Sequence, residues 1–345
     1  MTIRAAILGY GRSGSSLHAR PLDELDDFQV AAVCDVDPER QKQARERFGC
    51  VVYDDYHEML KRESLDVVSV VTWSDQHCRM TCDCLAAGVN VVVTKPWAVN
   101  VREAERMAAA AADSGMLLMP WLPARWGCDL LRLRQLMDAN AIGNVFLVRR
   151  AHCAFATRCD WQTQRVHGGG YLLNWGPHLI EPPYLLMGSR VTSVYARMKQ
   201  TINPGDVEDM FLAVMTLENG VVIQSEFAIA AEDLPSWFIQ GDEGAIVMHG
   251  PHLKLNHTTP KRPTDPTQPL FMKSEDTTIT EETIDGNLYG DEYAVYKAIA
   301  KALRGEEAFP VKPEDALELS RVIDAIRTSA EENRVVHLPT SPAVT

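Results

Sequence analysis

The chain has 345 residues, a length that predicts two domains rather than a single hydrophobic core. Hydrophobic residues make up 46% and charged residues 23%, which is typical of a globular protein and excludes intrinsic disorder and a collagen-like structure. The 47 acidic and 34 basic residues give a net charge of −13, and such a surface repels phosphate backbones and anionic lipids, so nucleic acid and membranes are poor partners.

The lack of a recognisable targeting segment and the pattern of cysteines both favour a cytoplasmic protein. No apolar run approaches the roughly 18 residues of a membrane-spanning helix, and a glycine interrupts the N-terminal apolar run too early for a secretory signal. The eight cysteines are scattered along the chain, so reduced structural thiols are expected. Cys78, Cys82 and Cys84 share a predicted helix, but no second ligand pair accompanies them, and no metal site is expected.

The first third of the chain alternates β-branched apolar runs with amphipathic stretches, the pattern of βαβ units around a parallel sheet. Strands are predicted at residues 5–8, 30–34, 67–71, 89–93 and 116–119. Asp37 as N-cap, Pro38 in the first turn and Gly49 just past the end predict one helix. Further helices are predicted over 75–88 and 101–114. The alternation fades after Met119, so the first domain is expected to span residues 1–121.

The remaining residues, 122–345, are expected to form a second domain. Helices are predicted at 130–140 and 168–186, with a strand at 145–153 between them. Strand-like runs follow at 191–198, 211–217, 221–227, 236–240 and 245–249. The turn Glu218-Asn219-Gly220 predicts a hairpin and so an antiparallel sheet. A Pro- and Thr-rich stretch, 258–276, predicts an exposed loop, and helices return at 291–303 and 313–332.

A glycine-rich motif follows the first strand and opens a helical stretch. Its residues are Gly9, Tyr10, Gly11, Arg12, Ser13 and Gly14. In a G-x-G-x-x-G sequence the glycines permit a tight turn, close approach to a pyrophosphate and close packing of helix on strand. Any glycine-rich turn can imitate the motif, but its position after an N-terminal strand favours dinucleotide binding.

Asp35 lies 24 residues after Gly11, at the end of the second predicted strand. A carboxylate there accepts hydrogen bonds from the ribose 2′-hydroxyl and repels a 2′-phosphate, so NAD is expected in preference to NADP. Asp35 or Asp37 can instead cap the next helix, and both roles can hold together. Arg40 lies close by and could serve a 2′-phosphate.

Two more strand ends carry residues that could face a bound nicotinamide, because ligands of open parallel sheets bind outside the carboxyl ends of the strands. These residues are Thr72, Trp73, His77, Thr94 and Lys95. Lys95 can orient a substrate hydroxyl and shift its proton affinity, or it can be a solvated loop lysine. His77 can contact the cofactor or simply begin the next helix.

The densest polar cluster lies between residues 160 and 178. Its candidate substrate-binding residues are Trp161, Arg165, His167, Asn174 and His178. Asn174 and His178 are at i,i+4, so on a helix both face the same site, although Pro177 requires that helix to be kinked or to begin close by. Histidine is suited to taking a proton near neutral pH, and the alternative is a structural histidine. Arg125, Arg158 and Arg165 weakly suggest an acidic or phosphorylated substrate.

Taken in order and spacing, these motifs resemble the glucose–fructose oxidoreductase and inositol dehydrogenase family, written Gfo/Idh/MocA. The resemblance covers nearly the whole chain and rests on the segments 9–14, 34–38, 94–96, 168–178, 306–316 and 329–330. It implies an N-terminal Rossmann dinucleotide-binding domain and a C-terminal α/β domain with a large, mostly antiparallel sheet that often forms subunit contacts. A homo-oligomer, either a dimer or a tetramer, is therefore expected.

The resemblance also implies catalytic roles. Lys95 matches the family's catalytic lysine and His178 its catalytic histidine, whereas Asn174 stands where the family usually has aspartate. An amide cannot stabilise an imidazolium with a charge, so His178 is expected to stay neutral to lower pH. Thr94 in place of glutamate and Trp73 in place of proline are further departures.

The resulting prediction is an NAD-dependent dehydrogenase or reductase that moves a hydride between the nicotinamide and a ring carbon of a sugar, inositol or related polyol. In this scheme His178 is the general base, Lys95 polarises the same oxygen and Asn174 orients the hydroxyls. One alternative is a redox-neutral glycosidase or lyase that acts through a transient keto-sugar. A second alternative is a non-catalytic nucleotide- or sugar-binding module.

Overall fold

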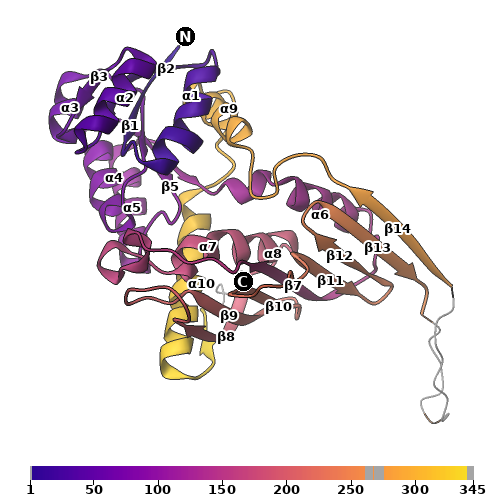
Figure 1. Ribbon diagram of the computed structural model, residues 1–345. Helices are drawn as coiled ribbons and strands as arrows, with labels where there is room; N and C mark the ends of the chain where they lie inside the picture. Colours follow the sequence, from indigo (N-terminus) through magenta and orange to yellow (C-terminus); the bar gives the residue numbers. More distant parts are fainter. Residues whose placement is uncertain (1, 261–266, 268–275, 340–345) are drawn as a thin grey trace.

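The computed structural model describes residues 2–260, 267 and 276–339, and it contains two sheets (Figure 1). The first sheet has six strands in the order β3-β2-β1-β4-β5-β6, all parallel. Its strands are β1 Ile3–Leu8, β2 Phe28–Cys34, β3 Val51–Tyr53, β4 Val67–Val70, β5 Asn90–Thr94 and β6 Leu118–Trp121. The β-branched runs of β4 and β5 are almost completely buried, as expected for parallel strands covered on both faces.

The five helices of this part are α1 Ala19–Glu24, α2 Pro38–Phe48, α3 Tyr56–Arg62, α4 His77–Ala86 and α5 Val101–Ser114. Three of them, α2, α3 and α5, begin at a side-chain cap. Asp37 accepts a hydrogen bond from the Glu39 amide at the start of α2, and Gly49 ends that helix in the left-handed conformation. A π-helical turn, Gly14–His18, joins the glycine loop to α1. The short β3 and α3 are not among the predicted elements.

The second sheet has nine strands in the order β14-β13-β12-β11-β7-β10-β9-β8-β15. Its strands are β7 Val145–Cys153, β8 Val191–Lys199, β9 Met210–Leu217, β10 Val222–Ala228, β11 Trp237–Gly241, β12 Gly244–His249, β13 His252–Thr258, β14 Thr277–Thr283 and β15 Val336–His337. Among the described strands of this sheet, only β7 and β10 pair in parallel. Gly220, with a φ of +84°, closes the predicted β9–β10 hairpin. Most of the predicted loop 258–276 lies outside the described residues.

Helices cover one face of this sheet (Figure 1). They are α6 Cys128–Asp138, α7 Tyr171–Leu179, α8 Glu181–Leu186 and α10 Pro313–Glu332. Side chains in β9, β10 and β11 alternate between buried and partly exposed positions, so one face packs against helices and the other stays open.

The long helix predicted at 168–186 is in fact two helices. Pro182 and Pro183 have no N–H to donate to the preceding turn, so α7 ends before them and they begin α8. The carbonyl of Leu179, which closes α7, instead accepts a hydrogen bond from the Ser225 hydroxyl of β10 at 2.7 Å. This bond ties the end of α7 to the second sheet.

The C-terminal helices pack against the part of the chain that holds the first sheet, whose last strand ends at Trp121. Helix α9, Glu292–Leu303, packs beside α1 at the top of Figure 1, and Tyr296 donates or accepts hydrogen bonds with His18 and Ser69. Helix α10 lies between α5 and β8. Its Ser320 accepts a hydrogen bond from the indole of Trp97. Both C-terminal helices therefore pack against elements of the first part of the chain. Among the helices described, none combines the length and apolar character that crossing a bilayer requires.

Candidate active site between the two sheets

The glycine loop after β1 has the close backbone contacts that its motif predicts. A Cβ on Gly9, whose φ is +90°, would lie 2.6 Å from the Val71 carbonyl oxygen, and one on Gly14 would lie 2.0 Å from the Gly9 oxygen. At Gly11 a Cβ would meet only the Arg40 guanidinium, at 3.6 Å. The first and third glycines are thus required by the protein's own packing. The space in front of the second remains open to a ligand, which fits the pyrophosphate of a dinucleotide.

Asp35 lies beneath this loop at the end of β2. Its two carboxylate oxygens accept hydrogen bonds from the backbone amides of Tyr10, at 2.6 Å, and Asp37, at 2.9 Å. Arg40 lies 3.5 Å from both Asp35 and Asp37. Asp35 therefore fixes the loop's backbone, and each oxygen keeps a lone pair for a ribose hydroxyl. The guanidinium of Arg40 stands on the same side as a competing site for a 2′-phosphate.

The segment after β5 carries Lys95 and is held from two sides. The ring of His77 on α4 lies 2.8 Å from the Pro96 carbonyl oxygen and 3.1 Å from that of Thr72. Burial lowers the pKa of His77, whereas the two carbonyl contacts act in the opposite direction. The Thr94 hydroxyl lies 3.3 Å from Nε2 of His18. His77 thus joins the two strand ends rather than presenting a free ring nitrogen to a ligand.

Helix α7 carries the two polar residues that face this segment. It starts at Tyr171, where the Glu208 carboxylate accepts a hydrogen bond from the Leu172 amide at 3.0 Å. Asn174 and His178 both lie within this helix, with Pro177 between them. Pro177 is the seventh residue of α7 and therefore lies inside the helix, where it cannot donate a backbone hydrogen bond to the Leu173 carbonyl.

Lys95 and Asn174 are in direct contact. The Lys95 Nζ donates to the Asn174 carbonyl oxygen at 2.9 Å and to its side-chain Oδ1 at 2.8 Å. Burial lowers the pKa of Lys95 to about 7, with smaller contributions from the positive charges of Arg12 and Arg158. The expected electrostatic coupling of Asn174 to His178 is therefore not the contact that forms, because the amide oxygen faces Lys95.

His178 is buried in an aromatic surrounding, with 9% of its surface exposed. Trp175 and Tyr289 lie edge-on to its ring, with centroids 5.9 and 5.8 Å away. Burial lowers its pKa well below the usual value, and the charges of Lys95 and Arg150 lower it further. His178 is therefore a neutral imidazole at neutral pH, as the sequence predicts, but mainly because it is desolvated.

Two residues that pack around Trp175 and His178, His152 and Tyr289, are not among those predicted from the sequence. His152 on β7 stacks on Trp175 at 4.0 Å, and its Nδ1 lies 2.8 Å from the hydroxyl of Tyr289. The alternation along β7 could have placed His152 on the covered face beside Val148. Tyr289 gives no comparable signal, because it comes from the loop before α9.

Trp73, Trp161 and His167 gather where the two parts of the chain meet. The Trp73 ring, on a residue 42% exposed, lies 4.1 Å from that of His167 and 6.4 Å from that of Trp161, measured between centroids. Asp75 lies 3.6 Å from Nδ1 of His167. These side chains form an aromatic edge beside the carboxyl end of β4.

Each of the three arginines suggested for substrate binding has a partner within the protein. Arg125 is buried and pairs with Glu181 at 2.6 Å and Asp315 at 3.1 Å, so its suggested role in substrate binding is wrong. Arg165 donates to the Asp206 carbonyl oxygen and is exposed. Arg158 pairs with Asp160 at 2.8 Å, yet it lies close enough to Lys95 to lower the pKa of that lysine.

Several buried polar atoms among the candidate site segments have no hydrogen-bond partner within the described residues. They are Ser74 Oγ, Gln162 Oε1, His167 Nδ1 and His178 Nδ1. Buried polar groups in proteins are nearly always paired, so such atoms mark places where a ligand or water completes the bonding. These four lie in the loops and the helix that carry the candidate site residues, which supports a polar ligand site there.

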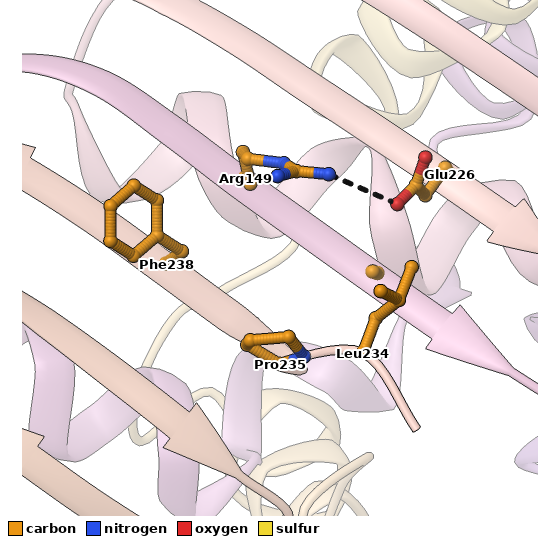
Figure 2. A pocket seen from close by; sticks show the side chains of 6 residues that line it. Arg149, Glu226, Leu234, Pro235 and Phe238 are labelled. Atoms are coloured by element: carbon orange, nitrogen blue, oxygen red, sulfur yellow. Dashed lines mark hydrogen bonds and ion pairs between the residues drawn. The ribbon is translucent and has the colours of Figure 1, made fainter. Parts of the chain in front are cut away.

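A separate hollow lies on the opposite, open face of the second sheet. Figure 2 shows its lining, formed by Arg149, Ala151, Glu226, Leu234, Pro235 and Phe238. Arg149 and Glu226 form an ion pair across it at 3.5 Å. Arg149 alternates along β7 with Arg150 and Val148, which are buried under the helices. This hollow is therefore separate from the site of Lys95 and His178.

Comparison with known proteins identifies the family to which both parts of the chain are similar. Residues 3–121 match the family described as "Oxidoreductase family, NAD-binding Rossmann fold", and residues 134–338 match "Oxidoreductase family, C-terminal alpha/beta domain". The chain is 27% identical over 351 residues to the scyllo-inositol 2-dehydrogenase (NADP(+)) of Bacillus subtilis, with 98% of this chain and 96% of that protein covered.

Two further relatives support the same fold. The chain is 25% identical over 240 residues to a myo-inositol 2-dehydrogenase of Thermotoga maritima, with 67% of this chain and 71% of that protein covered. The crystal structure of an NAD-binding protein from Listeria innocua superimposes with a TM-score of 0.85 at 26% identity, covering 98% of this chain and 97% of that one.

Proposed function

Because the chain belongs to the Gfo/Idh/MocA family of oxidoreductases, we propose that it transfers a hydride between a nicotinamide cofactor and a ring carbinol, or the matching ketone, of a sugar, inositol or related polyol. The observation that carries this proposal is the meeting of Lys95 and α7 at the carboxyl edge of the first sheet, where buried polar atoms lack partners. Two relatives are named as inositol dehydrogenases, which supports a polyol-like substrate.

The residues present fit a dinucleotide. Gly9, Gly11 and Gly14 leave a cradle that a Cβ would fill, and Asp35 and the strand-end residue Thr72 line the continuation of this edge. When bound there, a nicotinamide supplies the hydride acceptor or donor. The protein's own part is to hold the sugar carbinol, exclude water and move the hydroxyl proton.

Within this proposal Lys95 and His178 flank the reacting oxygen. Nζ of Lys95 can hold that oxygen, and the ring of His178, whose Nδ1 has no partner among the described residues, can accept or donate one further hydrogen bond. Trp161, Arg165 and His167 border the same opening from the loop before α7 and are proposed to contact the remaining sugar hydroxyls.

NAD is proposed as the preferred cofactor. The Asp35 carboxylate disfavours a 2′-phosphate by repulsion, whereas Arg40 would favour one, and the carboxylate lies nearer the buried floor of the site. The Bacillus relative is named for NADP(+) and the Listeria protein for NAD, so affinities for both cofactors must be measured.

The experiment is a panel of sugars, inositols and sugar acids offered to the purified protein with either oxidised cofactor, and reduced nicotinamide is followed by its absorbance. Turnover of at least one polyol supports the proposal. Loss of a substituent without net reduction of the cofactor would favour the redox-neutral alternative. No reaction of either kind across the panel would favour a binding module.

A homo-oligomer is also proposed, formed through the open face of the second sheet. Tyr195 and Val214 each expose 38% of their surface on strands of that face, and Phe238 lines its hollow. An open face with exposed apolar side chains is typical of a subunit interface. Light scattering of the purified chain tests this, and a monomeric mass would contradict it.

A further inference from the structure

The ε-amino group of Lys95 is anchored by two neutral acceptors. Its Nζ donates to the carbonyl oxygen and to the Oδ1 of the same residue, Asn174, at 2.9 and 2.8 Å. An uncharged amine has two N–H groups and one lone pair, whereas an ammonium has three N–H groups. Both forms can donate to the two amide oxygens, and they differ in kind at the third position on Nζ. That position is a lone pair in one form and a donor in the other.

The charges around Lys95 do not hold it as an ammonium. Lys95 forms no ion pair with a carboxylate of the described residues, and the charges that act on its pKa are the cations Arg12, from the glycine loop, and Arg158, from the loop after β7. The imidazoles of His77 on α4 and His178 on α7 are neutral, because burial lowers the pKa of each. Both forms of Lys95 are therefore populated near neutral pH, where its pKa of about 7 lies.

His178 is less suited to carry the same proton. It is buried, its ring lies against Trp175 and Tyr289, and the positive charge of Arg150 acts against an imidazolium whether Lys95 is charged or neutral. Protonating His178 would place a second positive charge in a desolvated site. A neutral ring can still orient the substrate by one hydrogen bond, without changing its own charge.

We propose that Lys95 and not His178 exchanges the proton of the reacting hydroxyl, as general base in oxidation and general acid in reduction, and that Asn174 is the positioning residue that permits this by being an amide. The assignment rests on the proposed oxidoreductase function and concerns the same site. It gives a physical reason for the asparagine at a position where the resemblance predicts aspartate.

The step balances without any further group. In oxidation the carbinol C–H bond supplies the hydride that a bound oxidised nicotinamide accepts, the O–H proton passes to the Lys95 lone pair, and the C=O bond forms. Lys95 leaves the step as an ammonium and returns its proton to solvent. The reverse step uses the third N–H of the ammonium, aimed at the carbonyl oxygen.

The first test measures the ionisation of Lys95 in the free protein. NMR of isotope-labelled lysine side chains, with the Lys95 signal assigned from Lys95→Met, gives its titration in wild type and in Asn174→Asp. A midpoint near 7 is expected in wild type. The carboxylate of Asn174→Asp is expected to raise that midpoint by about 1–3 pH units, as charge pairs do. A wild-type midpoint near 10.5, the usual value, would overturn the proposal even if the variant fails to fold.

The second test uses the pH profile of kcat/KM in the oxidising direction. The acidic limb reports the base of the free enzyme. It is expected to move to higher pH in Asn174→Asp and to stay in place in His178→Gln, whose kcat falls. A limb that disappears in His178→Gln and survives in Lys95→Met would assign the proton to the histidine and overturn the proposal.

The two failures are distinguishable. If Lys95 titrates near neutral pH but no polyol is turned over, the proposed function is refuted, and the catalytic role of Lys95 is refuted with it. If polyols are turned over while Lys95 titrates at its ordinary value, the proposed function holds and the proton assignment is refuted.

Discussion

The glycine loop permits a prediction that separates packing from ligand binding. In Gly14→Ala the new Cβ would lie 2.0 Å from the Gly9 oxygen, whereas real Cβ contacts are essentially never closer than 3.0 Å, so the atoms must separate by about 1 Å. Gly9 cannot retreat, because its amide donates to the Cys34 carbonyl oxygen at 2.8 Å and its Cα faces the Val71 carbonyl oxygen. Overpacking of this kind costs about 1–3 kcal/mol, and the rigid backbone neighbours place the cost in the upper part of that range.

Gly11→Ala is the matched control. Its Cβ would meet only the guanidinium of Arg40, at 3.6 Å, which is an ordinary van der Waals distance. The free energy of unfolding of the free protein is therefore expected to stay unchanged. The methyl group would nevertheless occupy the space proposed for the pyrophosphate. Loss of one hydrogen bond to a charged group costs about 1.5–3 kcal/mol, or roughly 10- to 100-fold in cofactor affinity.

Chemical denaturation of the free variants and calorimetric titration with NAD measure these two effects separately. Gly14→Ala should lose both stability and affinity, and Gly11→Ala should lose affinity alone. Wild-type affinity in Gly11→Ala would refute the pyrophosphate site. Wild-type stability in Gly14→Ala would show that the loop relaxes without cost and that the packing argument is wrong.

Four further predictions concern other parts of the molecule. Calorimetry should find NAD bound more tightly than NADP, with the preference weakened in Asp35→Asn; equal affinities in wild type would remove the ribose role of Asp35. His178→Ala should lower kcat by more than tenfold with little change in cofactor affinity, because it lies on the substrate side, and a smaller loss would indicate a structural histidine. Arg125→Ala should cost about 3–5 kcal/mol of stability, because it leaves the fully buried Glu181 carboxylate without its partner; an unchanged denaturation midpoint would contradict this. Burial lowers the pKa of His18 from 6.5 to about 3, so the unfolded chain binds a proton that the folded protein refuses, and stability is present above pH 6.5 and lost as pH falls below it. The free energy of unfolding should fall by about 2 kcal/mol between neutral pH and pH 5. If His18→Gln shows the same fall as the wild type, another group causes it.

Local chemistry was sufficient for the regular elements of this protein. The helix Val101–Ser114 and the helix Pro313–Glu332 have the predicted bounds, because caps, helix period and flanking glycine or proline act within a few residues of each other. The strand Val145–Cys153 and the glycine loop likewise depend on neighbours in sequence. Weaker patterns failed, since β3 has three residues and β14 has almost no buried face.

The contacts within the candidate site could not be predicted from the sequence and are seen only in the tertiary structure. Lys95 and Asn174 are 79 positions apart, and helical spacing could say only that Asn174 shares a face with His178, not which atom its amide would meet. The return of α9 brings Tyr296 to His18 from 278 positions away, and no local signal reports such a pairing. Sequence determined which residues of this protein carry chemistry, because residue type and period are local properties. Only the packing of the two sheets decided which of those residues meet, which lose their water, and therefore which of them can exchange a proton near neutral pH, because desolvation and charge depend on every element that surrounds a group.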